Sequence, residues 1–467
     1  MGNVKKSENI HPLLLLFMIV VLCAVLSYII PAGVYETAVD EESGIEVVVT
    51  DSFHYLKRDP ISVFELMTFI SHGMENAADI IFYLIIVGGM FGIVNGTGAL
   101  NLAIANVMKR LKGKEIILIP ILMIFFACGA AFCGNFEEFL VFVPLILAIC
   151  ITARLDSLTA VGIIFISATV GYAGAITNPF TLGTAQAIAG LPKYSGMSLR
   201  VILFIVLLFV SIVYVVGIAL MVKSKPKMSG SYDSDQEYNQ DKMLNLEDIP
   251  SLKFSQRLVL VCFFAGIFFS VFGVIKWEFY VNELSGVFLF TGILCGAVGR
   301  MSPNKICKEF SKGCRDILLP SLMIGLASTA VLILRETFVL DTILNSLAST
   351  LKKMPDNLTA CGMFFFHEIF NVVVPSGSTQ ARSTMPLMIA IADKAGITRQ
   401  TAVLAYHLGD AFTNILFPTS GEVVAALSIC HASFGKWVKY LLPLYIVWVI
   451  ISLVVIVIAV KVGYGPF

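Results

Sequence analysis

Two stretches of the 467-residue chain follow one pattern: residues 144–161 read PLILAICITARLDSLTAV, and residues 386–403 read PLMIAIADKAGITRQTAV. Both begin with Pro-Leu and end with Thr-Ala-Val, at one fixed offset. Further along, NPFTLG at 178–183 parallels FPTSG at 417–421, at a slightly different offset. Because several matches occur in the same order, the sequence predicts two related halves.

The composition is that of a membrane protein. Hydrophobic residues make up 57% of the chain, charged residues only 14%, and the mean hydropathy is +0.88. A soluble protein carries about 25% charged residues. The apolar runs do not alternate in polarity as barrel strands do, and the longest can cross a bilayer as a helix. We therefore predict an all-α polytopic membrane protein, with apolar runs at 13–30, 80–94, 116–128, 201–222, 258–274, 317–334 and 441–460.

Loop charges predict the orientation. Short loops rich in Lys and Arg face the cytoplasm, and such clusters lie at residues 5–6, 109–114, 223–227, 300–315 and 436–439. The segment 36–51 is acidic instead, and its turn signal Ser43-Gly44 precedes the β-prone run IEVVVT. We expect an extracytoplasmic hairpin over residues 35–57, a cytoplasmic N-terminus and a location in the bacterial inner membrane.

A polar stretch over residues 223–255 has the composition of a cytoplasmic linker. It separates a first transmembrane repeat, 1–222, from a second, 256–467. The second half has an additional span near residues 285–298, where the first half has its acidic hairpin. One extra crossing inverts the second copy, so we predict inverted-topology repeats.

Four stretches are too polar and too rich in Gly and Pro for ordinary spans. They are 133–144 and 171–186 in the first half, and 375–386 and 409–422 in the second. Helix breaks expose backbone groups that lipid cannot satisfy, so they persist only inside protein or beside a water-filled cavity. Each repeat should therefore contain a broken-helix hairpin, and the two hairpins should meet near the bilayer midplane.

Placing a charged side chain within the membrane costs free energy, so the charged groups in these stretches are candidate site residues. The alternatives to substrate binding are structural: Arg382 could form an ion pair that holds the hairpins together, or the acids could lie at the water interface. The uncharged candidates could equally cap helices. The complete predicted substrate-binding set is Asn135, Glu137, Glu138, Thr177, Asn178, Thr181, Gly183, Ser376, Gly377, Ser378, Gln380, Arg382, Asp410, Asn414, Thr419 and Ser420, with Glu422 as a further acid in the same stretches.

Enzyme and metal motifs find little support. His367-Glu368 begins like the zinc-protease motif, but the second His position is Asn371. Glu368 remains a candidate proton-carrying carboxylate. The sequence contains no GxxxxGK[ST] loop for ATP. We expect no enzyme activity, no metal site and no resident cofactor, with Na⁺ or H⁺ as the candidate coupling ion.

Residues 372–429, together with GNFEEFLVFVPLILAI and GYAGAITNPFTLGTAQAIAGLP in the first half, resemble the YfcC family. This family belongs with the anaerobic C4-dicarboxylate carrier (DcuC-like) proteins of the ion-transporter superfamily. The resemblance implies two inverted repeats with hairpins, an elevator-type carrier and a homodimer. Members are described as dicarboxylate carriers or as basic amino acid exchangers. Arg382 stands where the family pattern has a small residue.

Two charge arguments bear on the substrate. The acids Glu137, Glu138, Asp410 and Glu422 favour a cationic group, whereas Arg382 and the hairpin N-termini favour a carboxylate. An arginine- or ornithine-type amino acid satisfies both, so we expect an alternating-access exchanger of basic amino acids. The alternatives are a C4-dicarboxylate carrier coupled to H⁺ or Na⁺, and, from a different class, a channel. The expected partners are a small-molecule substrate and the lipid bilayer; with a net charge of zero, nucleic acid is not expected.

Overall fold

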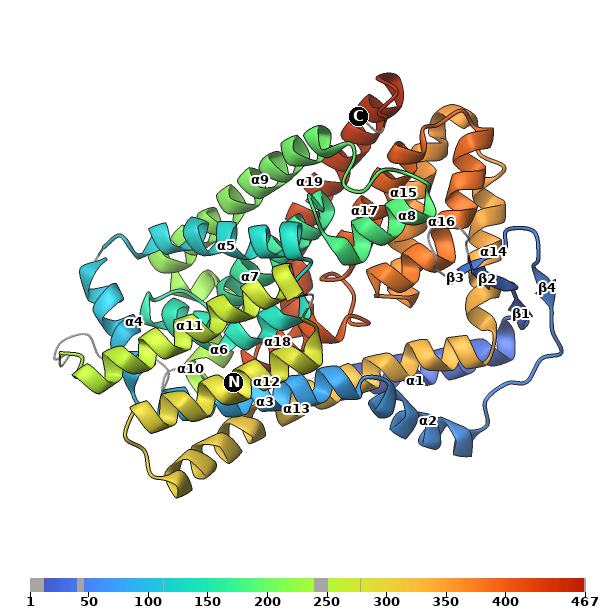
Figure 1. Cartoon of the computed structure of the whole chain (residues 1–467). Coiled ribbons are helices and arrows are strands. Elements are labelled where there is room, and N and C mark those ends of the chain that lie inside the picture. Colours follow the sequence, from blue (N-terminus) through green and yellow to red (C-terminus); the bar gives the residue numbers. More distant parts are fainter. Residues whose placement is uncertain (1–11, 40–45, 112, 239–250, 278, 466–467) are drawn as a thin grey trace, which may run out of the picture.

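The chain folds as a helical membrane protein with two related halves (Figure 1). The computed structural model describes residues 12–39, 46–111, 113–238, 251–277 and 279–465. Within these residues, seven helical stretches have the length and apolar composition of a membrane span. This confirms the predicted all-α polytopic fold. Lys5 and Lys6, the turn Ser43-Gly44 and residues 239–250 of the expected linker lie outside the described residues.

The first half begins with a span, a β segment and a pair of packed helices, and continues into the broken helices. Its helices are α1 (Pro12–Ile29), α2 (Val63–Asn76), α3 (Ala78–Gly96), α4 (Ala99–Arg110), η1 (Glu115–Ile117), α5 (Leu118–Cys133), η2 (Glu137–Phe142), α6 (Val143–Thr152), α7 (Ser157–Gly174), η3 (Pro179–Gly183), α8 (Thr184–Ile188) and α9 (Met197–Ser224).

The second half follows two short helices, η4 (Pro226–Met228) and α10 (Tyr232–Tyr238). It has an extra span in place of the β segment and one long helix, α13, in place of the packed pair. Its helices are α11 (Phe254–Trp277), α12 (Val281–Val298), α13 (Pro303–Glu336), α14 (Val339–Leu351), α15 (Asp356–Val373), α16 (Gly377–Lys394), α17 (Arg399–Thr413), α18 (Gly421–Ile429) and α19 (Phe434–Lys461). The extra span predicted near 285–298 is α12.

The expected hairpin over 35–57 is present. Strands β2 (Thr37–Val39) and β3 (Glu46–Val48) pair antiparallel, as do the flanking β1 (Gly33–Val34) and β4 (His54–Tyr55). The β segment therefore begins two residues earlier than predicted. It is fastened to the second half, because the backbone N–H of Tyr35 donates to Asp341 Oδ2 on α14 at 3.0 Å.

Helices α2 and α3 run antiparallel along the whole of α13, and this contact makes the inversion visible. Gly73 faces Thr329, Gly88 faces Gly313, and Gly96 faces Glu309, so residue numbers rise on one side as they fall on the other. Corresponding left-handed turns, Gly98 with φ 71° and Phe338 with φ 55°, follow α3 and α13. The second copy is therefore upside down relative to the first.

The broken stretches fall where the sequence predicts them. Two hairpins are formed by α5 with η2–α6 and by α15 with α16. Beside them α7 and α17 are almost wholly buried, and each stops within the protein. The chain leaves α7 at Gly174 and resumes regular structure at Pro179, and it leaves α17 at Thr413 and resumes at Gly421. These four interruptions bring Gly, Pro, Asn and Ser residues together at the middle of the molecule.

The expected linker, 223–255, is partly folded. Its helix α10 covers the beginning of α7, where Asp235 Oδ2 accepts from the N–H of Ser157 at 3.0 Å and Ser229 Oγ donates to Asp156 Oδ2 at 2.6 Å. Composition alone gave no sign of this, because the stabilising contacts are specific Ser–Asp hydrogen bonds and not apolar burial. The chain after α19 mirrors the arrangement: the carbonyl of Tyr464 accepts from Thr398 Oγ1, the N-cap of α17, at 2.5 Å.

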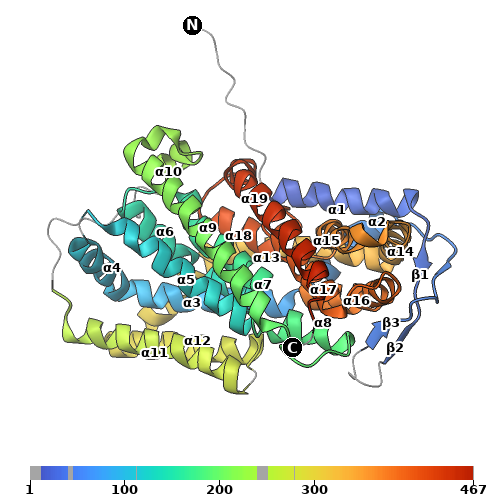
Figure 2. The same ribbon diagram turned by 90° about the horizontal axis from the view of Figure 1, so that it is seen from above.

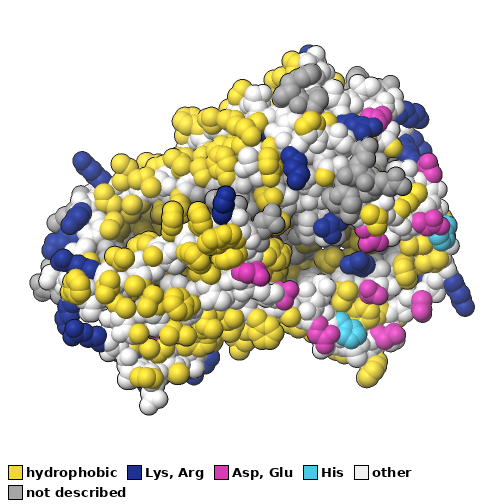
Figure 3. Space-filling view, viewed as in Figure 1, with side chains coloured by type: hydrophobic (Ala, Val, Ile, Leu, Met, Phe, Trp, Pro, Cys, Tyr) yellow, Lys and Arg dark blue, Asp and Glu magenta, His cyan; other side chains and the backbone are white. Residues whose placement is uncertain are grey.

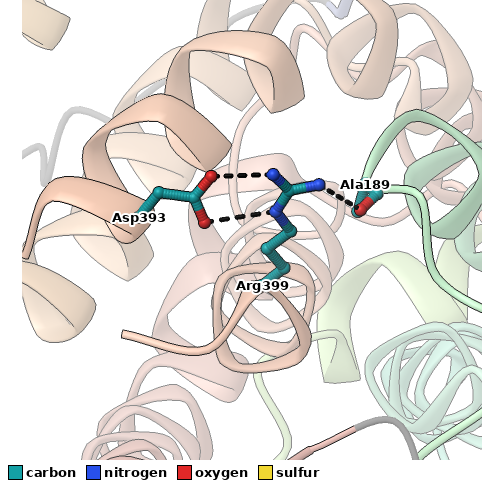
Figure 4. A network of polar contacts seen from close by, with 3 residues as sticks. All are labelled: Ala189, Asp393 and Arg399. Atoms are coloured by element: carbon teal, nitrogen blue, oxygen red, sulfur yellow. Dashed lines mark hydrogen bonds and ion pairs between the residues drawn. The ribbon is translucent and has the colours of Figure 1, made fainter. Parts of the chain in front are cut away.

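A polar contact joins the halves near one surface (Figure 4). Arg399 binds Asp393 through two nitrogens, at 3.1 and 2.8 Å, and donates a third bond to the carbonyl of Ala189 at the end of α8. Both charged side chains are nearly half exposed. An ion pair this exposed contributes only about 0–1 kcal/mol to the stability of the fold. The contact therefore serves more to position the two halves relative to each other than to stabilise them.

The surface has the pattern of a protein in a bilayer. Apolar side chains cover the flank formed by α9, α5, α11 and α12, and Lys and Arg gather at the end that carries α4 (Figure 3). At the opposite end, near the β strands, acidic and basic side chains mix. A second view shows α11 and α12 along one edge, outside α3, with α9 and α19 crossing the face turned toward the viewer (Figure 2).

We predict that Gly313→Ala destabilises the fold. A Cβ at this position would lie 2.0 Å from the carbonyl oxygen of Gly88, which is backbone and cannot move aside. Overpacking of this kind costs roughly 1–3 kcal/mol, so the melting temperature of the purified protein should fall. Gly217→Ala is the matched control, because a Cβ on this exposed α9 glycine meets nothing within 4 Å. Equal melting temperatures for the two variants would contradict the close α3–α13 contact.

Candidate functional site

A cavity of about 120 Å³ lies where the broken helices meet. The first half supplies η2, α7 and η3, the second half supplies the start of α16 and the loop before α18, and α3 and the start of α12 close the remaining sides. Half of the sixteen predicted site residues line it: Glu137, Glu138, Thr181, Ser376, Gly377, Ser378, Asn414 and Ser420. Glu422, the further predicted acid, also lines it.

Three carboxylates dominate the electrostatics of the cavity. Glu137 and Glu138 come from the tip of the first hairpin, and Glu422 comes from the first turn of α18. Glu138 Oε2 accepts from the N–H of Phe136 at 3.1 Å, and Glu422 Oε2 accepts from Ser420 Oγ at 2.7 Å. Within the described part of the chain, no Lys or Arg lines the cavity. The site therefore attracts positive charge.

The N-terminus of α16 supplies the opposite polarity. Its N-cap, Ser376, makes no side-chain capping bond and donates instead to Thr379 Oγ1 at 3.1 Å. The first-turn residues Gly377 and Ser378 line the cavity. Uncapped amides at a helix N-terminus, reinforced by the helix dipole, bind carboxylates and other anions. The lining of the cavity thus combines a helix N-terminus that can bind an anion with three acidic side chains.

The first half caps its own break. Asn178 is fully buried, and its Oδ1 accepts from the N–H groups of Phe180 and Thr181 at 2.9 and 3.2 Å. The N–H of Thr177 donates to the carbonyl of Ala131, and its hydroxyl donates to the carbonyl of Phe132, both on α5. Gly183 closes the turn through its N–H to the Asn178 carbonyl. These predicted residues shape the site without lining the cavity.

The two halves touch at Gly377. A Cβ on this glycine would lie 2.5 Å from Thr181 Cγ2 and 2.9 Å from Asp410 Oδ2, so only glycine fits between the first-half turn and α17. Tyr406 holds the position by donating from its hydroxyl to the Gly377 carbonyl at 2.6 Å. The start of α16 is therefore seated on the broken helix of the other repeat, and both halves are needed to complete the cavity.

Asn371 is a positioning residue that the sequence pattern did not reveal. Its Nδ2 donates to the carbonyl of Asp410, to Thr413 Oγ1 and to Asn414 Oδ1, at 2.7, 2.6 and 2.9 Å. It thereby pins the end of α17 and orients Asn414 at the cavity. Asp410 itself is buried beside Gly377 and does not line the cavity.

The remaining predicted residues lie around the cavity and do not line it. Gln380 is buried against His367, with its Nε2 3.0 Å from the imidazole Nδ1. Asn135 lies beside Glu138, and Thr419 lies in the loop before α18. Glu368, considered as a proton-carrying carboxylate, accepts from the Tyr445 hydroxyl at 2.5 Å and joins α15 to α19 away from the cavity.

Arg382, predicted either to bind substrate or to form an ion pair between the hairpins, lies away from the cavity in this structure. Its side chain is exposed on α16 and it lies outside the cavity lining, and among the described residues it forms no ion pair. Arg382 is five positions after Gly377, which rotates it about 140° around the helix from the cavity-lining start of α16. The positive end of the site is the α16 N-terminus and not this guanidinium.

Aromatic residues that were not predicted from the sequence also line the cavity: Tyr83, Phe136, Tyr172, Phe180 and Tyr280. Phe136 and Tyr172 lie with ring centroids 5.2 Å apart, and Phe180 and Tyr280 lie 5.9 Å apart. The chain has 35 Phe and 14 Tyr. In such apolar spans an aromatic residue gives no signal of function, so only the fold could single these out.

Several known proteins are similar to this chain in sequence. The family model of the C4-dicarboxylate anaerobic carriers matches residues 11–461. YfcC of Escherichia coli strain K12, whose name proposes a basic amino acid antiporter, is 30% identical over 489 residues, covering 97% of this chain and 96% of YfcC. An uncharacterized protein of Haemophilus influenzae is 28% identical over 391 residues, covering 83% of this chain and 77% of that protein.

Two solved transporter structures also align over nearly the whole chain. The YdaH transporter of Alcanivorax borkumensis has a TM-score of 0.42 and 15% identity, and covers 98% of this chain and 99% of its own. MtrF of Neisseria gonorrhoeae, described among antimetabolite efflux pumps, has a TM-score of 0.41 and 17% identity, and covers 98% and 96%.

We predict that Asn178→Ala lowers the free energy of unfolding by about 1 kcal/mol, because the N–H groups of Phe180 and Thr181 lose their acceptor. Asn178→Ser keeps a capping oxygen and should retain most of the stability. Melting temperatures of the two purified variants and the wild type provide the measurement. If the alanine variant melts no lower than the serine variant, Asn178 is not the cap that holds this break.

Proposed function

The chain belongs to the C4-dicarboxylate anaerobic carrier family, and from that premise we propose that this secondary transporter exchanges basic amino acids of the arginine and ornithine type across the bacterial inner membrane. The N-terminus lies in the cytoplasm in this proposal, in keeping with the Lys and Arg side chains gathered at the end that carries α4. The relative YfcC carries a name that proposes the same class of substrate.

The single observation that supports this substrate is that three carboxylates and the uncapped N-terminus of α16, whose first turn has no acidic side chain, line the same cavity. A basic amino acid carries a carboxylate, an α-ammonium group and a side-chain cation. Its carboxylate fits the amides at Gly377 and Ser378, and its two cations fit the acidic wall of Glu137, Glu138 and Glu422.

A C4-dicarboxylate is the second candidate, favoured by the open N-terminus of α16 and by the description of the family. Two carboxylates would then enter a cavity that already holds three, with no Lys or Arg lining it among the described residues. Coupling cations, H⁺ or Na⁺, would have to neutralise the repulsion. A basic amino acid brings two cations of its own and leaves one of the three acids unpaired, so we place it first.

The proposed mechanism is alternating access. Substrate bridges the two halves, because the carboxylate-binding end lies on the second hairpin and two of the three acids lie on the first. The broken helices then move against the α3–α13 pair. An empty site would carry uncompensated carboxylates through the membrane, which is costly, whereas the loaded site has two of its three acids paired. This difference favours exchange over net flux.

Counterflow in proteoliposomes tests the proposal. Vesicles loaded with unlabelled arginine should accumulate external labelled arginine, and ornithine should compete, whereas fumarate or succinate should not. Accumulation against a gradient of the labelled compound distinguishes a carrier from a channel. Competition by dicarboxylates without any effect of arginine or ornithine would reject the basic amino acid and favour the second candidate.

We predict that Glu138→Gln reduces arginine exchange about 10-fold or more, because a charge-assisted hydrogen bond to the substrate becomes a neutral one. Folding should be unaffected or improved, since one of three neighbouring negative charges disappears. Glu336→Gln is the control, because this glutamate is exposed at the end of α13 and lies outside the cavity lining. Wild-type exchange rates in the Glu138 variant would contradict a role of this carboxylate in binding.

A further inference from the structure

The turn between α11 and α12 places one aromatic side chain at the cavity. Tyr280 lines the cavity although 58% of its surface is exposed. Its ring lies 5.9 Å from that of Phe180, tilted by 49°. Phe180 belongs to the broken helix of the first half, so the two rings lie on opposite sides of the boundary between α11–α12 and the repeat core.

Tyr280 is held in place although it is exposed. Its N–H donates to Glu283 Oε2 at 3.1 Å, which fixes the start of α12. Beside it, Trp277 and Phe279 pack with ring centroids 5.5 Å apart, and Trp277 also contacts Phe272 at 5.2 Å. The N–H of Phe279 donates to the carbonyl of Gly273. An aromatic cluster thus supports the turn, and the Tyr280 ring presents a preformed surface to the site.

A second tyrosine offers an unused polar group. Tyr83 on α3 is 1% exposed, lines the cavity and packs edge-on against Phe288 of α12. Its hydroxyl is buried and finds no hydrogen-bond partner among the described residues. A buried hydroxyl without a partner is energetically unfavourable, and a ligand group in the cavity could supply the missing partner.

We propose that Tyr280 and Tyr83 form a specificity wall that selects a guanidinium side chain over a primary ammonium. This inference rests on the proposed function and names its preferred substrate. A guanidinium is planar and weakly hydrated, and it stacks on an aromatic face while its edge donates to carboxylates. The Tyr280 ring provides the face, Glu137 and Glu138 provide the acceptors, and the Tyr83 hydroxyl accepts a further N–H.

An ammonium group uses this wall less well. It is a compact, strongly hydrated charge, so it gains its binding energy from the carboxylates and loses more of its hydration when pressed against a ring. The acids alone therefore bind both kinds of side chain, and the aromatic wall discriminates between them. Arginine should bind more tightly than ornithine to the wild-type protein.

Calorimetric titration of the purified full-length protein tests the wall, with arginine and ornithine as the ligands. Tyr280→Leu removes the aromatic face and should weaken arginine binding about 5- to 30-fold, while ornithine binding changes less than about twofold. Tyr280→Phe retains the face and should keep the wild-type preference. Phe290→Leu is the matched control, because this α12 side chain is 67% exposed and lies outside the cavity lining.

Tyr83→Phe separates a ligand contact from a structural role. Removing a hydroxyl that has no partner should leave the melting temperature of the ligand-free protein unchanged or raised, and should weaken arginine binding. A lower melting temperature with unchanged arginine affinity would assign the hydroxyl to the fold and overturn its place in the wall.

Two further results bear on the proposals separately. Suppose that the wild-type protein binds both arginine and ornithine. The specificity wall is then wrong, and the proposed function stands, if Tyr280→Leu weakens the binding of both ligands equally or of neither. The same conclusion follows if ornithine binds more tightly than arginine. If the wild-type protein binds neither amino acid and binds a dicarboxylate instead, the proposed function fails, and the wall fails with it.

Discussion

A helix that stops inside a bilayer leaves backbone N–H and C=O groups that no water can reach, and the protein itself has to satisfy them. In this structure the requirement is met unevenly at the four interruptions. Asn178 caps one break, Glu138 binds the N–H of Phe136 at a second, and Ser420 and Glu422 occupy a third. The starts of α16 and α18 both lack a side-chain cap, but α18 carries Glu422 in its first turn, whereas the first turn of α16 has no acidic side chain. The anion-binding end of the site follows from that difference.

The extra crossing has two consequences for the site. By adding the single span α12, it turns the second half upside down, so that α3 and α13 pack antiparallel through Gly88 and Gly313. Small residues of this kind let membrane helices approach closely, where apolar burial alone gives no driving force. The same addition supplies a turn that reaches the cavity from outside the repeats and delivers Tyr280. The element that sets the topology therefore also contributes to the binding site.

Sequence reasoning could predict those features that depend on period, polarity and order. Long apolar runs predict spans, the repeated PL–TAV pattern predicts the two halves, and Gly-Pro-Asn stretches predict the breaks. It could not predict which face of a helix a side chain occupies after a break, and Arg382, a predicted site residue, is exposed on α16 outside the cavity lining. Nor could it distinguish Tyr280 or Tyr83 from the many aromatic residues of the spans. The packed α10 segment escaped notice because a few Ser–Asp hydrogen bonds hold it.

The uneven capping also fixes the direction in which a substrate can lie. Two inverted repeats with identical ends would bind a ligand in two orientations related by the pseudo-symmetry axis. Here the first hairpin presents Glu137 and Glu138, whereas the second presents free amides at Gly377 and Ser378. A ligand with a carboxylate at one end and a cation at the other therefore has one favourable orientation, with opposite ends on opposite repeats. In the proposed exchanger, movement of the repeats carries the ligand between compartments without reversing its contacts, because the asymmetry lies in side chains and caps that travel with each hairpin. Topological symmetry supplies the two access routes, and chemical asymmetry supplies the selectivity.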